Sequence, residues 1–468
     1  MNRQIKYRVV PNRWLEKAGY RLDCGPYMSG AIEAKELLKK HITIPLKDLT
    51  FGYHGGIFNG PRFPRTYVDD PYNGVPFLGS TDILSSDLSF LPLLSKKQIE
   101  KNPALVLDEG WSLITCSGTI GRMAYSRSGM KGLAGSQHFM RVVPDIQKIK
   151  PGYLYAYLSS RFGLPIVLSG TYGAIIQHIE PHHIEDLPVP RLGNIEGQSH
   201  HLIEESSDLL TDYENRISEA TQLYFDSVGL SDITASEWHS WGSDLGFSTT
   251  GKVQTLRALN YNPRFNRLCE RIKQGPWKTL SEICVPGTLK RGPRFSRIDA
   301  EPEAAYQMIG QKQIFWLRPE GRWIAKKSVG NEVLVPDGTI LVAAQGTLGE
   351  NELFCRSEFI TGSLIERAYS EHLLRIISDE NMMQTGALYA FIRSETAFRM
   401  FRSSSTGSKL QDFHYDVLPS LPIPYPPEDI RNRCNQLITE AYASREKAIE
   451  LEDQARTLVE NAIQEGAR

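Results

Sequence analysis

Two long stretches of the chain repeat apolar residues at seven-residue intervals. The first, residues 198–228, contains neither proline nor glycine. Its apolar positions fall on two interleaved registers, Ile203, Leu210, Ile217 and Tyr224 on one and Tyr213 and Ala220 on the other. This pattern predicts a long amphipathic helix with a single apolar stripe.

The second stretch closes the chain. Its two registers are Leu437, Ser444, Leu451 and Leu458 on one and Cys434, Ala441, Ala448, Ala455 and Ala462 on the other. A helix from about residue 428 to 464 would be roughly 55 Å long at ~1.5 Å per residue. Because neither helix can bury its stripe alone, we expect the two to pair as an antiparallel coiled coil. The alternative is a solvent-facing helix packed on its own domain.

The chain is also an internal duplication, with one long helix after each copy. Five segments recur in the same order: GPRF at 60–63 and 292–295, GTIG at 118–121 and GTLG at 346–349, SQHFMRVVPD at 136–145 and SEHLLRIISD at 370–379, LYAYL at 154–158 and LYAFI at 388–392, and LPVP at 187–190 and LPIP at 421–424. A repeat of this kind means that one structural unit occurs twice. The copies run from about 46 to 190 and from about 277 to 424.

Each copy is expected to be a mixed α+β domain. Apolar and β-branched runs, Trp111–Cys116 and Thr339–Ala343, end in the glycine turns and predict strands, whereas the stretches around 154–160 and 388–394 have helical spacing. We therefore predict two similar domains separated by two long antiparallel coiled-coil helices. The expected segments are a first domain with an N-terminal extension (1–193), a central spacer helix (194–230), a second domain (231–424) and a closing spacer helix (425–468).

Composition narrows the class of protein. The 468 residues are 41% hydrophobic and 23% charged, typical of a globular protein, and no run of 18 apolar residues occurs, so we expect no membrane partner. The six cysteines lie far apart and the start lacks a signal core, which favours reduced thiols and a cytoplasmic location. The net charge of −1 means that any nucleic-acid binding needs local positive charge or a partner's contribution.

No motif of a catalytic centre is found. There is no phosphate-binding loop of the GxxxxGK[ST] type, and Asp70-Pro71-Tyr72 lacks the second proline of the amino-methyltransferase tetrapeptide, so we interpret it as a surface turn. His178, Glu180, His182 and His183 resemble a metal cluster, but the second copy does not repeat them, which favours a chance grouping over a zinc site. We expect no catalytic residues, no metal and no cofactor.

The basic loops are the first candidates for a DNA contact. Each lies on a bend made by Gly and Pro beside an aromatic ring, and the candidates are Arg62, Phe63 and Arg65 in the first copy and Lys290, Arg291, Arg294 and Arg297 in the second. Arginine can fork to guanine or clamp a phosphate, and a bent, stiff loop loses little entropy on binding. The alternative is a solvated basic surface.

A second candidate region lies near the end of each copy. Tyr172-Gly173 with Gln177 aligns with Thr406-Gly407 and Gln411, and Lys409 lies close by. Glutamine and lysine are suitable contacts for base edges or phosphates. The alternative is that this glycine loop only shapes the domain.

Together these features resemble the specificity subunit of type I restriction-modification systems. The likeness is carried by SGTIGR at 117–122, GTLGE at 346–350, GYLYAYLSS at 152–160, YGAIIQHI at 172–179, the LPVP and LPIP exits and the helix after each. It implies two target-recognition domains, each reading half of a bipartite, asymmetric site in double-stranded DNA. Arg122, which closes the first glycine turn, is a further candidate DNA contact, while Glu350 stands at the matching place in the second copy.

The resemblance also implies partners. The helices would set the spacer and dock methyltransferase (modification) subunits, and a restriction/translocase subunit would join for cleavage; the helix positions named for this role are Ile203, Leu210, Ile217, Tyr224, Leu437, Leu451 and Leu458. Methyl transfer would belong to the partner. Two alternatives stay open: a specificity subunit of a related two-subunit restriction or phage-exclusion system, and a scaffold that binds protein rather than DNA.

Overall fold

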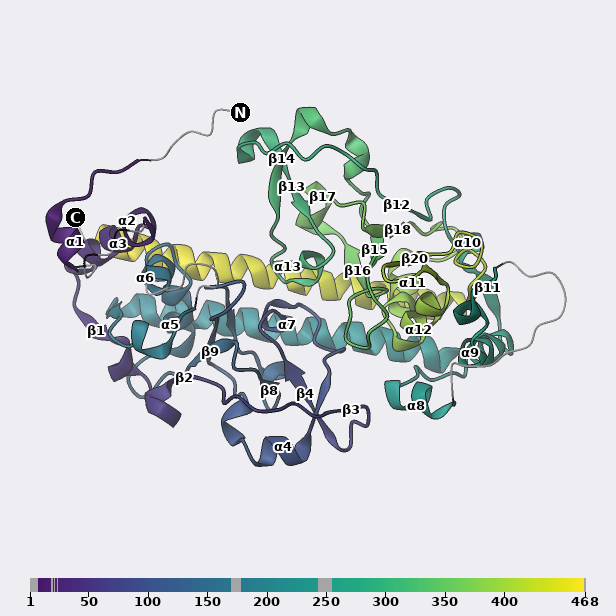
Figure 1. The fold of residues 1–468 in the computed structure, drawn as a ribbon, viewed down its shortest axis with the longest axis horizontal. Coiled ribbons are helices and arrows are strands. Elements are labelled where there is room, and N and C mark those ends of the chain that lie inside the picture. The colour runs from purple at the N-terminus through teal and green to yellow at the C-terminus, as the bar shows by residue number, and fades with distance from the viewer. Residues whose placement is uncertain are drawn as a thin grey trace. The chain divides into compact units, whose positions relative to one another are not determined.

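A computed structural model describes residues 7–17, 20, 22, 24–169, 178–242 and 255–466. The chain divides into two compact units. Unit 1 comprises residues 1–211 and 447–468, and unit 2 comprises residues 212–446. Each unit mixes helices with small sheets, which confirms the expected mixed class (Figure 1).

The central sheet of unit 1 has four strands in the order β2-β9-β6-β7, all antiparallel. A second sheet has the order β3-β5-β4-β8, with β8 parallel to β4, and β1 pairs with β10. The strands of unit 1 are β1 (Thr43–Pro45), β2 (Ile57–Asn59), β3 (Tyr67–Val68), β4 (Gly74–Leu78), β5 (Leu93–Ser95), β6 (Ser112–Thr115), β7 (Met123–Tyr125), β8 (Ala134–Gly135), β9 (Phe139–Val142) and β10 (Pro188–Pro190).

The helices of unit 1 pack on different parts of it. They are α1 (Asn12–Lys17), α2 (Gly25–Met28), α3 (Ala31–Leu38), α4 (Lys96–Glu100), α5 (Pro151–Leu158) and α6 (Gly163–Ser169). Helix α5 contacts β6 of the central sheet, α4 contacts β4 and β5 of the second sheet, and α3 contacts α6 and β10. Helix α5 is buried almost all round, so it lacks the polar face of a surface helix. Tyr153 and Tyr157 on this helix donate hydrogen bonds to the carbonyls of Pro190 and Pro188, which joins the helix to β10.

Unit 2 repeats the same topology. Its central sheet has the order β12-β18-β15-β16, and β13 pairs antiparallel with β14 and parallel with β17, as β4 does with β5 and β8. Its strands are β11 (Trp277–Thr279), β12 (Lys290–Arg291), β13 (Ala305–Ile309), β14 (Arg322–Ala325), β15 (Thr339–Ala343), β16 (Ser357–Ile360), β17 (Ala368–Tyr369), β18 (Leu373–Ile376), β19 (Ser405–Gly407), β20 (Gln411–Phe413) and β21 (Pro422–Pro424). The duplication expected from sequence is thus present in the fold.

The helices of unit 2 show that the repeat begins earlier than its sequence motifs. They are α8 (Ala235–Ser240), α9 (Pro263–Lys273), α10 (Leu280–Ile283), α11 (Thr385–Ile392) and α12 (Glu395–Ser403). Helix α9 packs on α12 and β21, and in unit 1 helix α3 packs on α6 and β10 in the same way. The segment before residue 46 therefore contributes α3 to the repeated unit, although no shared motif marks it.

The two predicted long helices are confirmed as α7 (Asn194–Ser227) and α13 (Glu428–Glu465), and each unit contains part of both (Figure 1). In unit 2 their segments run antiparallel, since Ser444 Oγ donates to Asp212 at 2.8 Å and Cys434 Sγ donates to the carbonyl of Ala220 at 3.5 Å. In unit 1, Ser206 Oγ donates to the carbonyl of Ala448 at 2.8 Å. The helix segments are thus part of the core of each unit.

Candidate nucleic-acid interface

The first basic loop of unit 1 follows strand β2 and keeps its arginines at the surface. Arg62 and Arg65 are exposed, whereas Phe63 is half-buried and packs against the cluster around Phe77. The Arg65 guanidinium lies 4.9 Å from the Phe77 ring centroid and donates to Gln137 Oε1 at 3.0 Å. The aromatic side chains therefore anchor the loop, and the cations face outward.

A histidine joins this loop to the glycine turn of the SGTIGR segment. Ser117 Oγ lies 3.0 Å from Nδ1 of His138, and Gln137 Nε2 lies 3.1 Å from its Nε2. Burial, followed by the positive charges of Arg65 and Arg62 and the nearby His178, lowers the pKa of His138 below its ordinary value. The ring is therefore neutral at pH 7 and can exchange hydrogen bonds with its polar neighbours. We call Arg62, Arg65, Ser117, Gln137 and His138 the Arg62 cluster.

A buried arginine supports this cluster from below. Arg141 is fully buried and donates to the carbonyls of Gly135 at 2.6 Å, Ser136 at 2.9 Å and Phe139 at 3.0 Å. Burial lowers its pKa to about 9, which leaves it protonated at neutral pH. A Cβ at Gly60 would lie 3.1 Å from Arg141 Nη1, so glycine lets the loop lie close to the guanidinium without displacing it.

The glycine turn after β6 is fixed by its own backbone and by helix α6. Thr115 Oγ1 accepts from the amide of Arg122 at 2.9 Å, and Gly118 and Gly121 have φ of 75° and 77°. A Cβ at Gly121 would lie 2.5 Å from Leu168 on α6. Arg122 closes this turn as a half-buried residue.

Unit 2 builds the equivalent surface with the same parts and different charges. Arg294 is exposed and Phe295 packs on a core cluster, as Arg62 and Phe63 do. A Cβ at Gly292 would lie 2.9 Å from Arg375 Nη2, which repeats the contact between Gly60 and Arg141. Sheet register pairs Lys290 with Arg375, just as it pairs Phe58 with Arg141.

Acidic partners distinguish the second surface from the first. Arg297 forms an ion pair with Glu371 at 2.9 Å, and Arg291 forms one with Asp412 at 3.0 Å. Lys290 is exposed on β12. We call Lys290, Arg291, Arg294, Arg297, Glu371 and His372 the Arg294 cluster. Two of its four cations are thus neutralised within unit 2.

The candidates near the end of each copy are placed differently. Gln411 is buried, its Oε1 accepts from Arg257 and its Nε2 donates to the carbonyl of Ser408. This placement does not fit the expected role of Gln411 at a base edge, because the amide stabilises the β19–β20 hairpin. Lys409 at the tip of that hairpin is exposed, and Gln177 lies outside the described residues.

The second glycine turn, in the longer loop 344–356, is held by helix α12. Arg402 donates to the carbonyls of Leu348 at 2.7 Å and Gly349 at 2.8 Å, and Arg399 forms an ion pair with Glu350 at 2.7 Å. Glu350 therefore has a structural partner within unit 2.

The seven helix positions expected to dock partners mostly face inward. Ile203, Leu210, Ile217, Tyr224, Leu437 and Leu451 are buried. Leu458 is only half-buried, and Val459 and Ile463 are buried in its place, so the expected heptad register is wrong in the last turns. A helix has 3.6 residues per turn, so a strict seven-residue repeat drifts around its surface. Any partner contact through these helices would use their outward faces.

Sequence reasoning missed Gln137, His138 and Arg141 as parts of the site. A signal was present, because Ser136, His138 and Arg141 recur as Ser370, His372 and Arg375 within the aligned segments. Only the pairing of β2 with β9 shows that this segment lies beside the GPRF loop.

The other motifs have local structural roles. Asp70 accepts hydrogen bonds from the amide of Tyr72 at 2.9 Å and from the side chain of Asn73, which makes the DPY segment a turn. His183 and Glu180 cap the 3-10 turn Pro181–His183. Within the described residues, no group of three or more His, Cys, Asp or Glu is placed to hold a metal, and no helix is both long and apolar enough to cross a membrane.

Comparisons with known proteins give matches among solved structures. No protein-family model matches the sequence, and no curated protein matches it. The chain is similar to the type I restriction-modification system S subunit from M. genitalium, with 10% identity, a TM-score of 0.35, and coverage of 91% of this chain and 95% of that one. It is also similar to the HsdS subunit from Thermoanaerobacter tengcongensis, with 14% identity, a TM-score of 0.27, and coverage of 90% of this chain and 96% of that one. A third similar chain comes from a structure of the assembly and conformational transition of the type I R-M system, with 12% identity, a TM-score of 0.26, and coverage of 90% of this chain and 97% of that one.

Proposed function

We propose that this chain is the DNA-recognition subunit of a type I restriction-modification complex. In this proposal units 1 and 2 each read one half of a bipartite, asymmetric site, and the helices α7 and α13 set the spacer and dock the methyltransferase subunits. A restriction/translocase subunit joins for cleavage, and the complex acts in the cytoplasm. Methyl transfer from S-adenosylmethionine to an extruded base belongs to the partner, since no catalytic motif was found in this chain.

The observation that supports the proposal is the repeated surface itself. In both units the loop with the exposed arginine contains a glycine that packs against the guanidinium of an inner arginine. A histidine lies three residues before that inner arginine in the sequence. A fixed scaffold with exposed guanidinium groups suits contacts to phosphates and guanine edges. The same scaffold with different neighbouring residues suits two readers of different sequences, which makes the site asymmetric.

The experiment begins with the complex isolated through a tag on this chain. A library of duplexes with a random centre is passed over it, and the retained sequences define the site. We expect two short conserved blocks with an unspecified spacer, and retention that falls steeply with salt. Retention of no DNA by the complete complex would contradict the proposal and favour a protein-binding scaffold, whereas a complex with a methyltransferase but no translocase would indicate a related two-subunit system.

Arg62→Ala and Arg294→Ala test the two surfaces separately. Each should weaken binding of the selected duplex by roughly 1 to 3 kcal/mol if the lost contact is bidentate to a base, and should relax specificity in one block only. Lys39→Ala is the control, because this exposed cation at the C-terminal end of α3 forms an ion pair with Glu36 at 2.8 Å outside both loops and both long helices. Equal loss in the control would mean that only overall charge matters.

A further inference from the structure

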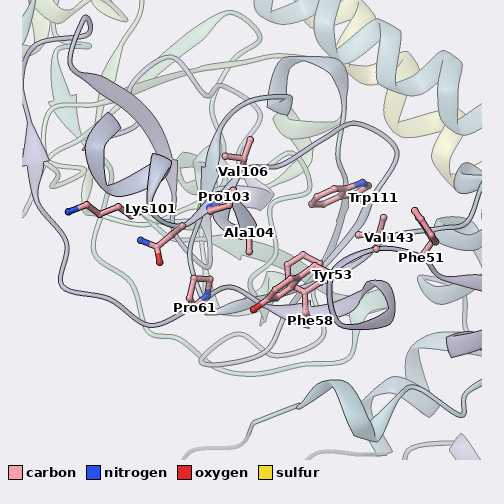
Figure 2. A pocket seen from close by; sticks show the side chains of 12 residues that line it. Phe51, Tyr53, Phe58, Pro61, Lys101, Pro103, Ala104, Val106, Trp111 and Val143 are labelled. Atoms are coloured by element: carbon pink, nitrogen blue, oxygen red, sulfur yellow. The ribbon is translucent and has the colours of Figure 1, made fainter.

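Unit 1 contains an aromatic cavity next to the GPRF loop. Its volume is about 480 Å³, which is within the range of ligand sites, roughly 300 to 1,000 Å³. Its lining combines rings, prolines and small apolar groups: Phe51, Tyr53, Phe58, Pro61, Pro103, Ala104, Val106, Trp111 and Val143, with Lys101 and Asn102. Figure 2 shows Lys101 at one end of the cavity and Phe51 with Trp111 toward the other.

The aromatic walls are held in place but are open to solvent. Tyr53 and Phe58 lie 5.0 Å apart in an edge-to-face arrangement, and Phe58 lies 6.4 Å from Trp111. Phe58 is buried, with the Arg141 guanidinium 5.7 Å from its ring centroid. Tyr53 is 53% exposed and Phe51 is 70% exposed. Exposed aromatic side chains gathered around a cavity make it a candidate binding surface.

The equivalent place in unit 2 is bridged by an arginine. NPALV at 102–106, which contributes four lining residues, aligns with NEVLV at 331–335. Arg375 donates to the carbonyls of Glu332 at 2.7 Å and Val333 at 3.5 Å, and Lys290 stands where unit 1 has Phe58. Arg141 instead turns to Gly135, Ser136 and Phe139. The aromatic cavity is therefore a property of unit 1 and does not follow from the shared fold.

We propose that this cavity takes an unstacked nucleobase of the DNA bound by unit 1; the inference rests on the function proposed above. Pro61 lines the cavity and Arg62 is the next residue, so a strand held by the loop passes the opening. Aromatic rings stack with any base, and a base leaves its duplex most readily at a mismatched or distorted step. Lys101 at the rim supplies a cation for the phosphate of the extruded nucleotide.

The test uses the complete complex and the duplex selected from the library. Single abasic sites are moved through the half-site, one position at a time. At the position whose base enters the cavity, we expect the wild-type complex to lose roughly tenfold in affinity, because the stacking contact is removed. Tyr53→Ala should lose a similar factor on the intact duplex and nothing more on that abasic duplex, since the two changes remove the same contact.

Two further variants make the result specific. Ala104→Trp fills the cavity without removing a ring and should weaken binding as Tyr53→Ala does, with an unchanged salt slope, whereas Arg62→Ala should reduce that slope. Tyr72→Ala is the control, since this 81% exposed ring of unit 1 does not line the cavity.

The outcomes separate the two proposals. Wild-type affinity in both Tyr53→Ala and Ala104→Trp would overturn the nucleobase site and leave the proposed function intact. Loss of the copurifying methyltransferase subunits in these variants would also overturn it, because the cavity would then hold an apolar side chain of the partner. Failure of the wild-type complex to retain any duplex would overturn both proposals.

Discussion

The two units place their exposed arginines on the same support but surround them with different charges. In the Arg62 cluster, Arg65 donates to the neutral amide of Gln137, whereas in the Arg294 cluster the matching Arg297 forms an ion pair with Glu371. An exposed ion pair contributes little to the free energy of unfolding. The main effect of the Glu371 carboxylate is therefore to lower the positive electrostatic potential around the loop. The comparison teaches that duplication has kept the geometry of the surface and varied its electrostatics.

The inner arginines that support the two loops also differ in how deeply they are buried. Arg141 is fully buried and binds three carbonyls of its own loop, whereas Arg375 is half-buried and binds two carbonyls of the turn Asn331–Val333. A buried guanidinium is stable only when acceptors compensate its charge, and around Arg141 these acceptors are backbone carbonyls. Unit 1 should therefore depend more strongly on its central arginine than unit 2 does.

Replacement of each central arginine by methionine gives the largest expected effect. Arg141→Met removes a charged donor from three buried carbonyls and should lower the free energy of unfolding by about 3 to 5 kcal/mol. Arg375→Met should lower it by about 1 to 2 kcal/mol, because water can reach the freed carbonyls. Urea unfolding measures the losses, and hydrogen exchange assigns each to its unit. Equal losses in the two variants would break the comparison of the supports.

Exchanging the residues beside the loop arginines should change DNA affinity by a smaller amount, with opposite signs in the two units. Gln137→Glu gives unit 1 the carboxylate of unit 2 and should weaken DNA binding by about 1 kcal/mol, while Glu371→Gln frees Arg297 and should strengthen it by a similar amount. Both changes should shrink as salt rises, because exposed charges are screened. Affinity for the selected duplex over a salt series is the measurement. Changes of the same sign would show that the carboxylate does not set the local potential.

Much of this scaffold could be predicted from sequence, because its signals are local. The repeat motifs, both long helices and the exposure of Arg62 and Arg294 follow from short patterns and turn chemistry. The heptad drift at Leu458 could not be predicted from spacing alone, since packing decides which side of a straight helix is buried. The burial of Gln411 could not be predicted for a related reason, because Arg257, which donates to its amide oxygen, lies far away in sequence.

The Arg62 cluster shows where sequence reasoning stops. His138 and Arg141 lie beside the GPRF loop only because β2 pairs with β9 in this register. No local sequence pattern predicts which strands pair when they lie about 80 residues apart. The aromatic cavity is similar, since Tyr53, Pro103 and Trp111 converge from separate loops. Helix α3 was missed because it shares its packing, but no motif, with α9.

The smallest expected effect is a pH dependence centred on His138. Burial and the charges of Arg65 and Arg62, with His178 nearby, lower the pKa of its imidazole, so the free protein holds it neutral at pH 7. A phosphate bound beside it would raise that pKa, and binding would then take up a proton. Affinity should therefore rise about two- to fivefold as the pH falls from 7.5 through the ordinary histidine value of ~6.5.

Stability should move in the opposite direction over the same range. Because the folded-state pKa of His138 is below its unfolded value, the unfolded chain binds more protons, and the free energy of unfolding should decrease as the pH falls through ~6.5. His138→Gln should abolish part of both trends, and calorimetry in buffers of different ionisation enthalpy counts the proton directly. His372→Gln in the Arg294 cluster is the matched control, since His372 aligns with His138 but lies 3.7 Å from the carboxylate of Glu371. If His138→Gln kept the full pH dependence, the proton would belong to another group, and unit 1 would not read phosphate through this histidine.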